Sequence, residues 1–205
     1  MKKYPVSESF LSFQGEGLHM GRKAYFVRLF GCNVRCPWCD TKYSWQLKPE
    51  RSEAASELAA AAARAKPEFA VITGGEPCIY DLSPLLAELK ARSIAAHLET
   101  SGTEEIKTGG SRFDWITLSP KLFNKPSAES LRLADELKFV IASPDDLPQY
   151  AEFVELAPNA KAAWLQPEFS RSGDRELLGA IADFVSERGG IFRAGAQLHR
   201  LYFAR

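Results

Sequence analysis

Short apolar runs alternate with helix-like segments along most of this 205-residue chain. The apolar runs cover residues 24–31, 69–73, 95–100, 114–119, 136–141 and 162–166. The predicted helices cover residues 52–65, 81–92, 127–135, 145–157 and 174–188. A repeated strand–helix–strand order predicts βαβ units and a parallel sheet. Six strands are too few for a complete eight-stranded barrel, so we expect one α/β domain over residues 1–205, built as a partial, abbreviated parallel barrel of the (β/α)6 type.

The helix predicted over residues 52–65 is rich in alanine and has a recognisable start. The hydroxyl of Ser52 can accept a hydrogen bond from a first-turn N–H group, and Glu53 would stand favourably near the positive end of the helix dipole. We therefore expect this helix to begin at Ser52.

The charge balance gives no sign of a polyanionic partner. Lys and Arg together number 26, as do Asp and Glu, so we expect no direct nucleic-acid partner. No apolar stretch follows the two lysines near the N-terminus, so we expect no signal peptide. No apolar run approaches the roughly 20 residues that span a bilayer. We expect no membrane partner and a cytoplasmic location, where thiols stay reduced.

Unusual sequences follow five of the six predicted strands. They are GCNVRCPWCDT, TGGEP, ETSGT, SPK and QPEF, after the first, second, third, fourth and sixth strands. The C-terminal ends of parallel strands in a barrel-like sheet face the same way and build the active site. We therefore expect these loops to form one site from distant parts of the chain.

Three cysteines stand close together in CNVRCPWCD: Cys32, Cys36 and Cys39. A closed zinc site usually takes four N or S ligands, and here Cys78 and the three histidines are distant in sequence. Cys36 and Cys39 alone would form a thiol–disulfide redox motif, which leaves Cys32 unexplained. Three thiolates on one loop suit an iron–sulfur cluster in which one iron lacks a protein ligand. Spacing leaves these interpretations open, and Cys78 is predicted to be a small buried residue.

Two motifs resemble the radical S-adenosylmethionine (SAM) superfamily. They are Cys32-x₃-Cys36-x₂-Cys39, with Trp38 before the last cysteine, and Gly74-Gly75-Glu76-Pro77. Further motifs resemble the 7-carboxy-7-deazaguanine synthase family, in order along essentially the whole chain. These motifs are Phe13-Gln14-Gly15-Glu16-Gly17, Arg28-x₂-Gly31-Cys32, Cys39-Asp40-Thr41, Glu99-Thr100-Ser101-Gly102-Thr103, Ser119-Pro120-Lys121, Gln166-Pro167 and Gln197-x-His199. The partial barrel also resembles that family's reduced version of the superfamily barrel.

The resemblance implies a lyase that depends on SAM, a 4Fe-4S cluster and Mg²⁺. Cys32, Cys36 and Cys39 would hold the cluster, whose open iron would bind SAM, and Thr41 would be a magnesium ligand. The implied substrate is a small pterin, 6-carboxy-5,6,7,8-tetrahydropterin. A Mg-assisted radical ring contraction would convert it to 7-carboxy-7-deazaguanine with loss of ammonia, on the route to 7-deazapurines such as the queuosine precursor.

The resemblance also assigns contacts to individual residues. The implied SAM contacts are Trp38, Cys39, Asp40, Gly74, Gly75, Glu76, Thr100, Ser101, Ser119, Pro120, Lys121, Gln166, Pro167, Glu168 and Phe169. The implied substrate contacts are Phe13, Gln14, Gly15, Glu16, Arg28, Thr73, Gln197, His199 and Arg205. Gly74 and Gly75 would let the backbone approach SAM, the alternative being a simple strand-to-helix turn. Arg28, within an apolar strand, needs a partner, which is either the substrate carboxylate or an internal acidic residue.

The C-terminal tail, residues 194–205, is expected to close the substrate site. His199 and Glu16 are the candidates for a protein acid or base, and a packed or exposed role is the alternative for His199. The terminal carboxylate of Arg205 is expected to reach the substrate, although its basic side chain departs from the family pattern. The resemblance further implies a homodimer and an electron donor such as flavodoxin. The alternatives are another radical SAM enzyme, such as a glycyl-radical activase, or a non-catalytic zinc or thiol-redox protein.

Overall fold

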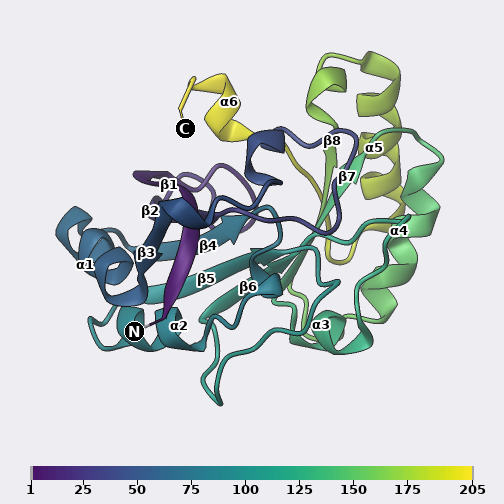
Figure 1. Cartoon of the computed structure of the whole chain (residues 1–205). Helices are drawn as coiled ribbons and strands as arrows, with labels where there is room; N and C mark the ends of the chain where they lie inside the picture. The colour runs from purple at the N-terminus through teal and green to yellow at the C-terminus, as the bar shows by residue number, and fades with distance from the viewer. Residues whose placement is uncertain (1, 205) are drawn as a thin grey trace.

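The predicted strands form the middle of one sheet in the computed structural model, which describes residues 2–204 (Figure 1). Within these residues the sheet has nine strands in the order β3-β1-β2-β4-β5-β6-β7-β8-β9. Their bounds are β1 Lys3–Phe13, β2 Lys23–Leu29, β3 Ser52–Ala54, β4 Phe69–Gly74, β5 Ala95–Thr100, β6 Trp115–Leu118, β7 Glu136–Ile141, β8 Ala163–Pro167 and β9 Phe192–Ala194. All neighbours from β2 to β9 pair in parallel, which confirms the α/β class and the abbreviated parallel barrel.

Three strands lie outside the sequence prediction. β1 pairs antiparallel with β2 on one side and with β3 on the other, and β9 adds a seventh parallel strand after β8. Polar residues interrupt the apolar pattern of β1, and β3 and β9 each have three residues, too few to establish a period. These three strands therefore form because they pair with neighbouring strands at the sheet margins, and their own sequence pattern does not reveal them.

The predicted helices are all present, and short 3₁₀ turns join several strands to the helices. The helices are α1 Ala55–Ala65, α2 Ser83–Lys90, α3 Ala128–Leu133, α4 Asp146–Glu155 and α5 Arg175–Arg188, followed by the short α6 Leu198–Leu201. The 3₁₀ turns are η1 Lys42–Ser44, η2 Pro49–Arg51, η3 Pro77–Ile79 and η4 Phe169–Arg171. None of the helices within residues 2–204 is long and apolar enough to cross a bilayer.

The prediction that the first helix begins at Ser52 is wrong. Ser52–Ala54 form β3, which pairs with the start of β1, so α1 begins at Ala55. The side chain of Glu57 accepts a hydrogen bond from the Ala54 N–H group at 2.9 Å, which satisfies one of the free donors at the helix start. Ser52 and Glu53 are therefore paired in a strand and cannot form the first turn of the helix.

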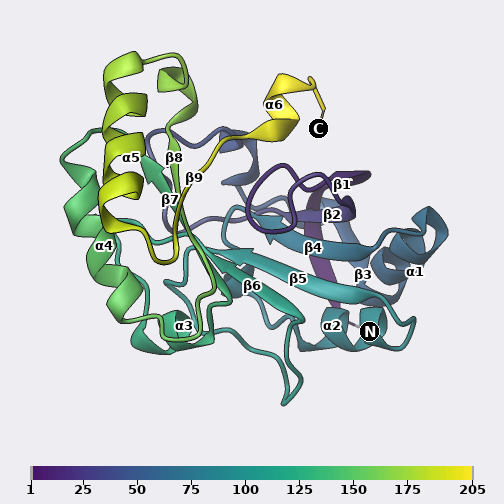
Figure 2. The same ribbon diagram turned by 180° about the vertical axis from the view of Figure 1, so that it is seen from behind.

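The helices cover the outer face of the sheet in two groups (Figures 1 and 2). α1 and α2 pack against one apolar cluster with β1, β2, β4 and β5. α3, α4 and α5 pack against a second cluster built on β6, β7 and β8. The outer face is thus apolar, which leaves the inner face for the site.

Alternation along each parallel strand separates these two faces. In β4, Ala70 and Ile72 belong to the outer core, whereas Phe69 and Val71 face inward and Thr73 lines a pocket. The same period places Arg28 of β2 on the inner face, beyond Phe26. The inner face is therefore apolar at its base and polar at the C-terminal strand ends.

Candidate active site

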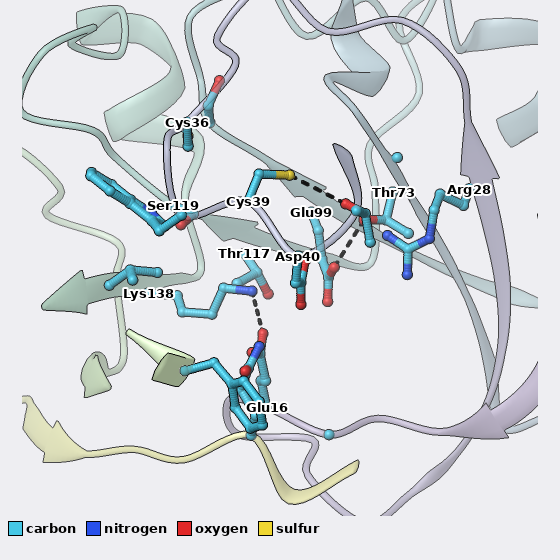
Figure 3. Close-up of a pocket in the computed structure, with 18 of the residues that line it drawn as sticks. Glu16, Arg28, Cys36, Cys39, Asp40, Thr73, Glu99, Thr117, Ser119 and Lys138 are labelled. Atoms are coloured by element: carbon cyan, nitrogen blue, oxygen red, sulfur yellow. Dashed lines mark hydrogen bonds and ion pairs between the residues drawn. The ribbon is translucent and has the colours of Figure 1, made fainter. Parts of the chain in front are cut away.

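One pocket lies at the C-terminal ends of the parallel strands, and loops from distant parts of the chain line it (Figure 3). Most of the residues singled out in the sequence line it: Phe13, Gln14, Gly15, Glu16, Arg28, Cys32, Cys36, Trp38, Cys39, Asp40, Thr41, Thr73, Gly74, Gly75, Thr100, Ser101, Ser119, Lys121, Gln166, Pro167, Glu168, Phe169, Gln197 and His199. Glu76 and Pro120 are not among its lining residues, and Arg205 lies outside the described residues.

All four cysteines carry free thiols, but they lie in two environments. Cys32, Cys36 and Cys39 are half-buried and line the pocket. Burial raises the pKa of the Cys36 thiol, although the nearby Lys121 opposes this effect. Cys78 is 3% exposed and packs in the apolar cluster under α1 and α2, as the sequence predicts.

The three pocket thiols do not surround a single point. Within residues 2–204, no group of three or more His, Cys, Asp or Glu side chains could hold one metal ion. Each cysteine of an iron–sulfur cluster binds a different iron, so its thiolates stand apart around the cluster. Three free thiols on one loop facing one pocket, with the fourth thiol buried elsewhere, fit a 4Fe-4S cluster with one open iron. A closed zinc site does not fit this donor set.

Gly74 and Gly75 let the end of β4 approach the end of β2. Gly74 has φ +151°, and a Cβ atom there would lie 2.4 Å from the carbonyl oxygen of Leu29. A Cβ atom at Gly75 would lie 2.1 Å from the carbonyl oxygen of Gly31. A Cβ atom at Gly75 would also lie 2.7 Å from the Cβ atom of Cys32. The packing of the chain itself therefore requires the two glycines, apart from any approach of SAM.

Glu76 lies beneath the pocket wall instead of in it. Its carboxylate is 1% exposed and accepts hydrogen bonds from the hydroxyl groups of Thr100 and Ser101, both at 2.5 Å. It also accepts from the N–H groups of Ser101 at 2.8 Å and Cys78 at 3.0 Å. Glu76 thereby joins the loop after β4 to the loop after β5, both of which line the pocket.

Glu99 is held on the inner wall by two donors. The side-chain amide of Gln14 donates to Oε1 at 2.9 Å, and the hydroxyl of Thr73 donates to Oε2 at 3.0 Å. Glu99 lines the pocket beside Thr73 (Figure 3). An oriented carboxylate of this kind can accept hydrogen bonds from N–H groups of a ligand.

Glu16 is the centre of a buried polar network on the opposite side of the pocket from Cys36 and Cys39 (Figure 3). It forms an ion pair with Lys138 and accepts hydrogen bonds from the side-chain amides of Gln166 at 3.0 Å and Gln197 at 2.9 Å. Burial alone would raise the pKa of Glu16, but Lys138 and the two amides lower it to about 2. Glu16 is therefore ionised at neutral pH, so of the two predicted roles, acid or base, its carboxylate has the form of a proton acceptor.

His199 lies on α6, against the backbone of Gly15. A Cβ atom at Gly15 would meet its Nδ1 atom at 2.0 Å, so the imidazole occupies the space that the glycine leaves. Burial lowers the pKa of His199, while the charge of Glu16 opposes this effect. The ring lines the pocket and favours the neutral form, which can either donate or accept a proton at one nitrogen.

Arg28 has the internal acidic partner that was one of its two predicted alternatives. Its Nε atom forms an ion pair with Glu8 Oε1 at 2.8 Å. The guanidinium nevertheless points into the pocket, where a substrate group can meet it (Figure 3). The internal partner and the pocket position are therefore compatible.

Lys121 is buried on the same loop as Ser119, after β6. Its Nζ atom donates to the carbonyl and hydroxyl oxygens of Ser119, at 2.6 and 2.7 Å. Burial lowers the pKa of Lys121 to about 8, although the neighbouring Cys36 opposes the shift. An ammonium group is thus fixed close to the cysteine loop.

Several lining residues were not assigned from the sequence: Phe10, Phe26, Val34, Trp45, Glu99, Thr117, Lys138 and Val140. Strand alternation offered a signal for some of them. In ELKFVI, the outer-face residues Leu137, Phe139 and Ile141 are apolar, which marks Lys138 as a polar residue on the inner face. Val34 and Trp45 lie in irregular segments that have no such period.

Comparisons with known proteins agree with this geometry. Residues 27–160 match the family described as the Radical SAM superfamily, and the chain belongs to that superfamily. A 7-carboxy-7-deazaguanine synthase from Synechocystis is 49% identical over 143 residues, covering 70% of this chain and 67% of the relative. Another from Flavobacterium psychrophilum is 38% identical and covers 96% of this chain and 90% of the relative. Within the superfamily, the chain is a member of the 7-carboxy-7-deazaguanine synthase family.

A solved structure has the same fold over nearly the whole chain. The crystal structure of QueE from Escherichia coli aligns with a TM-score of 0.84 at 30% identity and covers 96% of this chain and 95% of that chain. As a radical SAM protein, the chain uses SAM and a 4Fe-4S cluster.

Proposed function

We propose that this pocket converts 6-carboxy-5,6,7,8-tetrahydropterin into 7-carboxy-7-deazaguanine and ammonia, as a lyase on the route to 7-deazapurines. One observation carries the proposal: the three free thiols of one loop and the polar wall containing Arg28, Glu99 and Glu16 line the same pocket. A radical source and a site for a charged, hydrogen-bonding ring are therefore close together. The product named in the relatives supplies the identity of the ring.

Cys32, Cys36 and Cys39 would hold the cluster, and the loops after β4, β5, β6 and β8 would hold SAM. When bound, the cluster and SAM together supply the radical that starts the ring contraction. The glycine backbone at the end of β4 and the side chains on the loop with Ser119 support this assignment, because both lie beside the cysteine loop.

The protein groups on the other wall would bind and orient the pterin. The guanidinium of Arg28 would bind the substrate carboxylate, and Glu99 would accept hydrogen bonds from ring N–H groups. Gln14 and Thr73 fix the direction of Glu99, and Lys138 keeps Glu16 ionised. The wall would thereby hold one ring face toward the cysteine loop.

The C-terminal tail would cover the pterin. The side-chain amide of Gln197 donates to Glu16, and the Leu198 N–H group donates to the Gly15 carbonyl oxygen, both at 2.9 Å. These contacts support closure of the site by residues 194–204. His199 would be the candidate for donating a proton to the pterin, because it lies on the same segment and lines the pocket.

Thr41 would ligate Mg²⁺ together with substrate oxygens and waters, an arrangement that Mg²⁺ commonly adopts. Its side chain lines the pocket, and its hydroxyl lies 3.5 Å from the Cys39 sulfur. A neutral oxygen beside the cysteine loop supports this role. Asp40 is engaged by Arg200 at 3.0 Å, so it is a weaker candidate for the ion.

Two proposals concern partners. Pairing of two copies is supported by exposed apolar side chains at the chain end: Leu201 is 69%, Tyr202 70% and Phe203 96% exposed. A reduced flavodoxin would supply electrons at the cysteine loop, and a cytoplasmic location would provide such a donor. Light scattering tests the first proposal, and turnover with reduced flavodoxin as the only reductant tests the second.

Anaerobic turnover tests the reaction itself. The cluster-loaded protein, given reductant, SAM, Mg²⁺ and 6-carboxytetrahydropterin, is expected to form the deazaguanine product with equimolar ammonia. Cluster-loaded protein that cleaves SAM but forms no such product would instead favour another radical SAM reaction, such as glycyl-radical activation. A colourless protein with stoichiometric zinc after anaerobic reconstitution would favour the non-catalytic alternative.

A further inference from the structure

Glu8 reaches the inner face of the sheet through an irregularity in β1. Val6 pairs with Leu29, and both belong to the outer apolar core. Glu8, two residues later, would face the same side in a regular strand, but the register shifts between Val6 and Glu8, so Glu8 pairs with Arg28. β-Bulges commonly re-aim a side chain in this way. The bulge thus moves one carboxylate from the apolar side of the sheet to the side of the pocket.

The carboxylate of Glu8 joins two elements. Its Oε1 atom accepts hydrogen bonds from Arg28 Nε at 2.8 Å and from the Tyr43 hydroxyl at 2.7 Å. The side chains of Glu8 and Arg28 are 17% and 18% exposed, so solvent screens this ion pair only in part.

The hydrogen bond at Nε fixes the plane of the Arg28 guanidinium. Among residues 2–204, no hydrogen bond engages its two terminal nitrogens, and the group points into the pocket (Figure 3). A guanidinium binds a carboxylate best through two parallel N–H groups, which requires a defined orientation. Tyr43 lies on η1, immediately after the segment that carries Cys39 and Thr41, so it ties this segment to β1.

We propose that Glu8 and Tyr43 are positioning residues that hold the Arg28 guanidinium in the orientation that binds the substrate carboxylate. The inference rests on the proposed function, in which Arg28 is the carboxylate anchor. Glu8 acts through Arg28 and is not among the residues that line the pocket. Because Tyr43 shares the carboxylate of Glu8, the orientation of the anchor also depends on the position of the cysteine loop.

Two pterins separate positioning from general stability. The affinities of 6-carboxytetrahydropterin and of tetrahydropterin, which lacks the carboxylate, are measured by anaerobic titration of the cluster-loaded protein with SAM present. The affinity for 6-carboxytetrahydropterin divided by the affinity for tetrahydropterin reports the contribution of the carboxylate. Glu8→Gln is expected to lower this ratio by at least about tenfold, since it removes a charged hydrogen bond that orients Arg28. Affinity for tetrahydropterin and for SAM is expected to stay as in the wild type.

Tyr43→Phe provides a milder variant that keeps the ion pair. It is expected to lower the ratio by about threefold, and to have no further effect when combined with Glu8→Gln, because both changes act on one carboxylate. The control is Glu88→Gln, which removes a carboxylate on α2 that is paired with Arg92, outside the pocket. It is expected to leave the ratio unchanged.

The outcomes distinguish this inference from the proposed function. A wild type without preference for the carboxylated pterin, or an Arg28→Ala variant that retains the preference, would contradict the proposed role of Arg28. A preference that depends on Arg28 but not on Glu8 or Tyr43 would overturn only the positioning role. Equal weakening of both pterins in the Glu8 and Tyr43 variants would also overturn it, since this indicates a structural role.

Discussion

Gly17 lies directly against the carboxylate of Glu136. A Cβ atom at Gly17 would come within 2.4 Å of Glu136 Oε1, and the N–H group of Leu18 donates to Oε2 at 2.9 Å. Glu136 is 2% exposed and accepts three further hydrogen bonds, from the indoles of Trp115 and Trp164 and the hydroxyl of Thr117. This buried carboxylate therefore anchors the segment after β1, which places Gln14 and Glu16 in the pocket.

Gly17→Ala is expected to displace this segment. The residue has φ +72°, and the added methyl group would collide with Glu136. We expect KM for the carboxypterin to rise by about tenfold or more, with SAM cleavage in the absence of pterin near the wild-type rate. Steady-state product formation and SAM cleavage, measured on the same preparations, check this expectation.

Gly21→Ala is the matched control for Gly17→Ala. Gly21 has φ +83° in the same loop, but a Cβ atom there would meet nothing within 4 Å. Both variants place an alanine in a left-handed conformation, which costs about 1 kcal/mol, but only Gly17→Ala also collides with Glu136. Equal KM changes in the two variants would show that strain, and not the contact with Glu136, determines the effect.

Gly75→Ala is expected to reduce cluster loading. The new methyl group would lie 2.1 Å from the Gly31 carbonyl oxygen and 2.7 Å from the Cys32 Cβ atom, so it would push the first cysteine away. Iron and sulfide content per chain, with the visible absorbance, measures the loss after anaerobic reconstitution. Gly173→Ala, at a position with nothing within 4 Å, is expected to load fully. Full loading of Gly75→Ala would contradict the close packing of β4 against the cysteine loop.

The ion pair between Glu16 and Lys138 is expected to stabilise the fold over a defined pH range. The folded pKa of Glu16, about 2, lies below the unfolded value of about 4.3. A depressed carboxyl pKa gives stability that is present above about pH 4.3 and is lost as the pH falls toward 2. The difference in unfolding free energy between the wild type and Glu16→Gln should therefore shrink over that acidic range.

A double-mutant cycle at pH 7 tests the same pair. Lys138→Met leaves the Glu16 carboxylate buried without its cation, which typically costs about 3–5 kcal/mol. Adding Glu16→Gln removes the uncompensated charge and is expected to recover a large part of that loss. Urea unfolding of the four proteins gives the coupling energy. Additive effects of the two changes would mean that the buried charges are not coupled.

Thr41→Ala tests the proposed magnesium ligand. We expect the Mg²⁺ concentration for half-maximal product formation to rise by about tenfold, with pterin-independent SAM cleavage unchanged. Thr41→Ser retains a hydroxyl at the same position and is expected to resemble the wild type. An unchanged Mg²⁺ dependence in Thr41→Ala would contradict the assignment.

The sequence predicted the middle of the sheet better than its margins. Strands such as β4 and β7 carry their own apolar period, whereas β3 and β9 have three residues each and depend on their neighbours. At the site, motif residues on loops could be assigned individually. Lys138 and Glu8 could not, since their roles follow from an ion pair over 122 residues and from a bulge that no local pattern reveals.

Arg200 links the C-terminal tail to two loops of the pocket. Its guanidinium forms an ion pair with Asp40 at 3.0 Å, and it lies over the ring of Phe169 with its central carbon 4.6 Å from the ring centroid. Asp40 belongs to the cysteine loop, and Phe169 begins η4 after β8. The tail therefore depends on the positions of both loops.

Arg200→Ala is expected to loosen this closure without abolishing it. The ion pair is about one-third exposed, with side-chain exposures of 36% and 37%, so its loss should cost no more than about 1 kcal/mol. We expect KM for the carboxypterin to rise by about fivefold and cleavage of the tail by trypsin at Arg193 to become faster. Because salt screens an exposed pair, the wild type at high ionic strength should approach the variant. The control is Lys90→Ala at the end of α2, which is remote from the tail and the pocket. A tail that is cleaved at the wild-type rate, with KM unchanged, would show that Gln197 and Leu198 hold it without Arg200.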